Sequence, residues 1–116
     1  MTQQQNKELA EWYGLELKGS KTPYIEFPDK DNPKITVADI WQPDTDSNQL
    51  DLLEDKMVKE LGRLEMQLAS DGAMGMVLCW HSYIQDGVAK EIKGKGKTKN
   101  EARLNAIYNY VKGLNQ

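Results

Sequence analysis

Apolar positions recur every three or four residues in three stretches of the chain, which is the spacing of one face of an α-helix. The last stretch carries the longest such series: Leu104, Ile107, Tyr108, Val111 and Leu114. Gly14 and Gly62 follow the first two stretches, where glycine adopts the left-handed helix end without strain. The pattern predicts helices over residues 2–13, 46–61 and 98–112.

Between the second and third of these helices the apolar period changes from 3.6 to 2, which is typical of β-strands. We predict strands over residues 64–69, 74–84 and 88–92, with Asp86–Gly87 as the turn of a two-residue hairpin. Residues 28–45 contain three prolines and many acids and are predicted to be rich in loops.

The long middle strand is apolar on both faces. Met76, Leu78 and Trp80 share one face, and the residues between them share the other: Val77, Cys79 and His81. A strand of this kind is usually covered on both sides. We therefore predict a single α+β domain over residues 1–116, an α/β/α sandwich. Its mainly antiparallel sheet would have three to four strands, with helices on both faces.

Composition excludes several classes of protein. No apolar run approaches the roughly 20 residues that a membrane-spanning helix needs. The first residues carry neither the basic start nor the apolar stretch of a secretory signal, so we expect none. A single cysteine and a single histidine exclude an intrachain disulfide and multi-histidine metal sites. We expect a protein of the cytoplasm.

The charge is unevenly distributed along the chain. Residues 88–103 hold six basic and two acidic residues, a net of +4, in a chain whose net charge is −3. Residues 93–97, KGKGK, are predicted to form a flexible loop whose glycines expose backbone N–H groups before a helix, an arrangement that favours anions. The candidate anion- or nucleic-acid-binding residues are Lys93, Lys95, Lys97, Lys99 and Arg103. The alternative is a solvated loop.

Two other patterns each have a functional interpretation and a structural one. Cys79 and His81 lie on one face of a strand, as a nucleophile and its base would, but a packed cysteine beside a hydrogen-bonded histidine explains them as well. Asp44, Asp46 and Asn48 resemble the opening of a calcium loop, although a helix cap explains the same residues. We predict no catalytic residue, no metal site and no cofactor.

The three tryptophans are many for a chain of this size. Trp12 and Trp80 occupy positions that predict core packing. For Trp41, in a loop before Pro43, the pattern leaves two alternatives open: core packing, or a place on a surface that binds a partner.

Three short motifs extend along nearly the whole chain: an N-terminal helix end, a W-x-P-x-T-D-x-N helix entry and a G-x-G-x-T-x-x-E-A helix start. They comprise Leu9, Ala10, Gly14, Trp41, Pro43, Thr45, Asp46, Asn48, Gly94, Gly96, Thr98, Glu101 and Ala102. In this order they resemble the phage ABA sandwich family, which consists of small bacteriophage and prophage proteins. The resemblance implies an antiparallel sheet between helices and no established activity.

From residue 46 onward the predicted α-β-β-β-α order also resembles double-stranded RNA-binding domains. The residues that carry this likeness are Gly94, Gly96, Thr98, Lys99, Ala102, Arg103 and Ala106. The sequence departs from that family at Asn100, which replaces a basic residue, and in the turn SDGAMG, which lacks proline and histidine. The second face of the long strand is also expected to be more open in that family.

Together these patterns predict a phage or prophage accessory protein of the bacterial host cytoplasm. It would be a non-catalytic binding module that acts on a host or phage protein. The alternative is a nucleic-acid-binding module that uses the basic residues 93–103. A homo-oligomer is compatible with either hypothesis.

Overall fold

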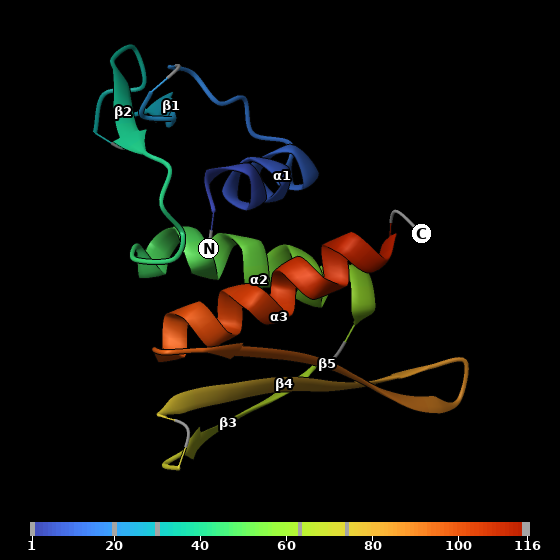
Figure 1. The fold of residues 1–116 in the computed structure, drawn as a ribbon. Helices are drawn as coiled ribbons and strands as arrows, with labels where there is room; N and C mark the ends of the chain where they lie inside the picture. Colours follow the sequence, from blue (N-terminus) through green and yellow to red (C-terminus); the bar gives the residue numbers. More distant parts are fainter. Residues whose placement is uncertain (1, 20, 30, 63, 74, 115–116) are drawn as a thin grey trace.

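The computed structural model describes residues 2–19, 21–29, 31–62, 64–73 and 75–114. These residues form three helices and five strands. Figure 1 shows the helices above a three-stranded sheet, with a separate pair of strands on the helical side. In chain order the elements are α1 (Gln3–Tyr13), β1 (Tyr24–Pro28), β2 (Thr36–Ile40), α2 (Ser47–Leu61), β3 (Glu65–Asp71), β4 (Met76–Gln85), β5 (Val88–Gly96) and α3 (Lys99–Leu114).

The helices begin and end where local chemistry satisfies their backbone groups. Thr2 and Gln5 form a reciprocal capping box at the start of α1, and Gly14 ends that helix at a φ of 97°. Asp46 caps α2 by accepting hydrogen bonds from the backbone N–H groups of Asn48 and Gln49. Each predicted helix is confirmed with ends within two residues of the observed ones.

Two antiparallel sheets are present. The larger has the strand order β3-β4-β5, and its register places Leu68 opposite Cys79 and Cys79 opposite Gly94. The predicted Asp86–Gly87 turn joins β4 to β5, and both of its residues have positive φ angles, 55° and 77°. That conformation is the one that matches the twist of a two-residue hairpin. The smaller sheet pairs β1 with β2.

The core lies between the helices and one face of the larger sheet. Fully buried side chains from α1, α2 and α3 meet there with residues of β4 and β5. The buried apolar residues are Leu9, Ala10, Ile25, Trp41, Leu50, Leu53, Met57, Cys79, Ile92, Ala102, Leu104, Ala106, Ile107, Tyr108 and Val111. Burial of these side chains is the main favourable term in the free energy of folding.

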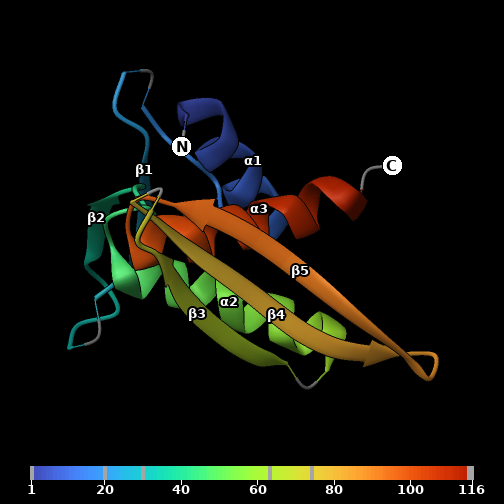
Figure 2. The same cartoon turned by 60° about the horizontal axis from the view of Figure 1, so that its bottom comes forward.

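The predicted α+β class, with helices packed on an antiparallel sheet, is confirmed. The prediction that helices lie on both faces of the sheet needs correction. Helix α3 packs on β4 and β5, α2 lies beside α3, and α1 packs on α2 and α3 (Figure 1). Figure 2 looks onto the opposite face of the sheet, and none of the described helices lies over it. An antiparallel sheet is able to face water on one side, and we call this side the outer face.

Two predicted boundaries also change. The loop-rich segment 28–45 contains strand β2, which pairs with β1. Strand β5 continues to Gly96 instead of ending at residue 92, so the predicted flexible loop 93–97 is mostly strand. Its two glycines are required by the close approach of α3, and they do not loosen the chain.

Candidate functional site

The candidate site is a row of four lysines on and after β5. Lys93 and Lys95 alternate with buried Gly94 and Gly96, so both lysine side chains lie on the outer face. Lys97 and Lys99 follow at the start of α3, and all four residues are exposed. Lys93, Lys95, Lys97 and Lys99 are called the lysine row below. The structure thus leaves four of the five predicted basic residues exposed, two on the outer face and two where the chain enters α3.

Two asparagines on α3 hold the backbone of this row. Asn105 donates a hydrogen bond of 2.5 Å to the carbonyl oxygen of Lys95, and Asn109 donates one of 2.8 Å to that of Lys93. The pair lies four residues apart on α3 and therefore on one helix face. These bonds fix the edge of β5, and with it the direction of the two lysine side chains. Neither asparagine was predicted from the sequence, although their i, i+4 spacing is visible there.

Gly94 and Gly96 bring α3 against β5. A Cβ atom on Gly94 would lie 2.2 Å from the backbone nitrogen of Ala106, and one on Gly96 would lie 2.6 Å from that of Ala102. Both glycines are buried and paired in register with β4, Gly94 with Cys79 and Gly96 with Val77. The predicted anion cradle of exposed glycine N–H groups is therefore not formed there.

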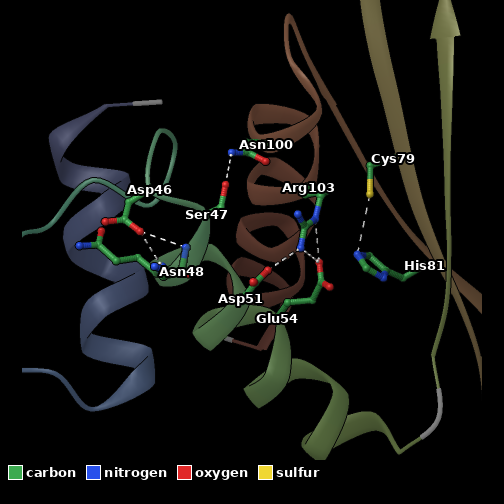
Figure 3. A network of polar contacts seen from close by, with 10 residues as sticks. Asp46, Ser47, Asn48, Asp51, Glu54, Cys79, His81, Asn100 and Arg103 are labelled. Carbon is green, nitrogen blue, oxygen red and sulfur yellow. Dashed lines mark hydrogen bonds and ion pairs between the residues drawn. The ribbon is translucent and has the colours of Figure 1, made fainter. Parts of the chain in front are cut away.

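Arg103, the fifth predicted basic residue, lies apart from the row. Its side chain is 16% exposed and contacts two acids of α2. The guanidinium donates to Glu54 at 3.1 Å and to Asp51 at 3.0 Å (Figure 3). Burial lowers the pKa of Arg103, but the bonds to Glu54 and Asp51 outweigh burial and raise it. Arg103 thus joins α3 to α2, and its charge is already compensated.

Cys79 and His81 lie on the inner face of β4, with 1% of each residue exposed. The Cys79 Sγ and His81 Nε2 atoms are 3.8 Å apart (Figure 3). His81 Nδ1 is buried and has no hydrogen-bond partner among the described residues. Burial raises the pKa of Cys79 to about 11 and lowers the pKa of His81. A protonated, inaccessible thiol is a poor nucleophile, so this geometry favours the packing interpretation.

Asp46 caps α2, as the helix-cap interpretation of this segment states. Ser47, the first residue of α2, accepts a hydrogen bond from Asn100 on α3 at 3.0 Å. Among the residues that the structure describes, no group of three or more His, Cys, Asp or Glu side chains is arranged to hold a metal ion.

The tryptophans occupy three different environments. Trp41 is 4% exposed, and its indole N–H donates to the Asn6 carbonyl at 2.7 Å, so it fixes the loop before α2 to α1. Trp12 packs edge to face on Tyr110. Trp80 was predicted to be a core residue, but it lies on the outer face, half-buried among its strand neighbours.

Comparison of the chain with protein-family models, curated proteins and solved structures gave no significant match. The phage ABA sandwich resemblance therefore stays a prediction. The open outer face removes one departure from double-stranded RNA-binding domains, while Asn100 and the β3–β4 turn remain departures. Of the helices within the described ranges, none has the length and apolarity to cross a membrane.

Proposed function

We propose that this protein is a small non-catalytic binding module whose lysine row binds the phosphate backbone of a nucleic acid. The observation that carries the proposal is the lysine row itself, four exposed lysines, of which Lys93 and Lys95 lie on a strand whose backbone Asn109 and Asn105 hold. Alternate residues of a strand are about 6.7 Å apart, so Lys93 and Lys95 are spaced along a line, and Lys97 and Lys99 continue the chain from the end of that strand into α3. A line of cations suits a linear polyanion.

The lysine row is also nearly free of competing carboxylates. Among the described residues, its one ion pair joins Lys93 to Glu91 at 3.5 Å, with the two side chains 75% and 51% exposed. An exposed pair of this kind contributes at most about 1 kcal/mol, so a phosphate can replace the carboxylate. Binding to phosphates releases condensed counterions, and that gain operates even when the protein as a whole is acidic.

The test compares two variants with equal loss of charge. One replaces all four members of the lysine row with glutamine. The control replaces four exposed lysines on other elements with glutamine: Lys7, Lys21, Lys34 and Lys59. Affinity for a fluorescein-labelled oligonucleotide is measured by anisotropy across a series of salt concentrations.

We expect the row variant to bind more weakly. The slope of log affinity against log salt concentration should become smaller in magnitude by roughly two to three, at about 0.7 for each lost contact with a single strand. The control variant should keep the wild-type slope. Equal losses in the two variants would mean that only net charge matters, and no binding by the wild type at low salt would refute the proposal.

The second candidate is the one that the sequence predicts, a protein partner of phage or host origin. It is favoured by Met66 and Leu68, which share a face of edge strand β3 and are 41% and 37% exposed. Apolar side chains beside a free strand edge suit an added strand from a partner. The substitutions M66K and L68K should abolish capture of a specific protein from a bacterial lysate, while I84K, at a site 73% exposed on β4, should not. Capture that survives M66K and L68K would remove this candidate.

A further inference from the structure

The outer face carries an aromatic side chain beside the lysine row. Trp80 lies on the central strand β4, directly opposite Gln67 on β3 and Lys93 on β5. Val77 and Tyr83 of the same strand pack against the core, whereas Trp80 and Leu78 are not part of that packing. The indole is therefore held by strand neighbours, and part of it is open to solvent.

An open hollow of about 470 Å³ adjoins this indole. Its lining includes Leu78 and Trp80 of β4 and three charged residues of β5, Glu91, Lys93 and Lys95. The register sets this composition, since Leu78 is opposite Lys95 and Trp80 is opposite Lys93. Leu78 and Trp80 thus each lie opposite a lysine on the neighbouring strand.

A flat aromatic surface flanked by cations matches one class of ligand. The bases of a single strand expose their π faces and stack on aromatic side chains, while lysines contact the phosphates. A duplex hides those faces within its own stack. Duplex binding through the helices is also disfavoured here, because Asp51 and Glu54 already compensate Arg103 at the junction of α2 and α3.

We infer that the outer face binds a single-stranded nucleic acid, with a base stacked on Trp80 and the adjacent phosphates on Lys93 and Lys95. This inference rests on the proposed function, since it uses two members of the lysine row. It adds the form of the nucleic acid and the residue that selects it. It also assigns Glu91 an inhibitory role, because that carboxylate competes with phosphate for Lys93.

The experiment uses the full chain and a labelled polyuridine oligonucleotide of about 12 nucleotides, within the range of known single-strand sites. An unlabelled RNA duplex of the same length is the competitor. The variants are W80A, W80F, which keeps an aromatic ring, and E91Q. The control is F27A, which removes an aromatic side chain that is 41% exposed on β1.

W80A should weaken binding by about 5- to 150-fold, the effect of losing one stacked base. W80F should retain most of the affinity, E91Q should bind more tightly than the wild type, and F27A should bind as the wild type does. The duplex should compete at least tenfold less well than the unlabelled single strand. In the wild type, the oligonucleotide should quench tryptophan emission, and we assign that quenching to Trp80. Of the other two tryptophans, Trp41 is buried and Trp12 lies on α1, above the other helices (Figure 1).

Failure of this inference differs from failure of the proposed function. If W80A binds like the wild type, or the duplex competes equally well, while the lysine-row variant still loses affinity, stacking is refuted and backbone binding stands. If W80A fails to fold, unchanged affinity in E91Q together with absent quenching in the wild type refutes the inference. If neither nucleic acid binds the folded wild type, both proposals are refuted.

Discussion

Gly94 on β5 and Ala106 on α3 lie so close that a Cβ atom on the glycine would be 2.2 Å from the alanine backbone nitrogen. The carbonyl oxygen of Ala102 would be almost as near, at 2.4 Å. Both neighbours are backbone atoms of a helix, which cannot turn aside as a flexible side chain would. The packing of α3 on the sheet therefore depends on the absence of a side chain at Gly94.

The first prediction is that G94A destabilises the protein severely. The helix must move away from β5 to admit the methyl group, so we expect the free energy of unfolding to fall by about 3 kcal/mol or more. Urea unfolding measures the change. G72A is the control, because nothing lies within 4 Å of the new methyl group, and it should change stability by less than about 1 kcal/mol. Equal, small effects of the two substitutions would contradict the observed packing.

The second prediction concerns the ion pairs of Arg103. R103A should lower the free energy of unfolding by about 2–3 kcal/mol, because it leaves Glu54, whose side chain is 20% exposed, without its partner. E54Q should cost less, and D51N should cost under about 1 kcal/mol, since Asp51 is 60% exposed. Thermal or urea unfolding of the three variants tests this order. A neutral R103A, or D51N as costly as E54Q, would show that the arginine is not held as described.

The third prediction is a pH dependence that His81 contributes. Burial lowers the pKa of His81 in the folded state; Glu54 raises it by a smaller amount, and Arg103 lowers it further. Below pH 6.5 the unfolded chain therefore takes up a proton that the folded protein does not. Stability contributed by neutral His81 should thus fall with decreasing pH, at up to about 1.4 kcal/mol per pH unit.

H81L removes this proton linkage. Urea unfolding of the wild type and the variant between pH 5 and 8 should give stability curves that run parallel above pH 7. Below pH 6.5 the wild-type curve should fall more steeply than that of H81L, because carboxylates common to both proteins largely cancel in the difference. Curves that stay parallel over the whole range would mean that His81 titrates normally in the folded protein.

The sequence predicts the local elements well where backbone chemistry is decisive. The Asp46 cap, the Gly14 helix end and the Asp86–Gly87 turn each depend on a conformation or a hydrogen bond that few residues supply. Those signals are local, so a single sequence contains them. The order of helices and strands from residue 47 onward follows from them together with the change of apolar period.

The layering was harder to predict for a physical reason. Alternation shows that Leu78 and Trp80 share a face, but an apolar face is compatible with a covering helix or with a binding surface. The glycines of KGKGK are ambiguous in the same way, since glycine permits both flexible loops and close packing. Only the contacts of α3 with Gly94 and Gly96 show that these glycines serve close packing.

The candidate site was predicted in part. The lysine row was found from charge alone, but Arg103 was grouped with it because sequence does not reveal the distant acids Asp51 and Glu54. Trp80 was assigned to the core, and the support from Asn105 and Asn109 was missed, since both depend on how α3 lies along β5. Tertiary contacts, and not local pattern, define this site.

The central claim is that the outer face is the binding surface, and amide chemical-shift mapping tests it most directly. ¹⁵N-labelled protein is titrated with the polyuridine oligonucleotide at low salt. We predict that shifts concentrate at residues 78–80 and 93–97 and at the Trp80 indole, with α1 and the β1–β2 sheet unchanged. Shifts that concentrate on the helices, or no shifts at a saturating concentration of oligonucleotide, would contradict the claim.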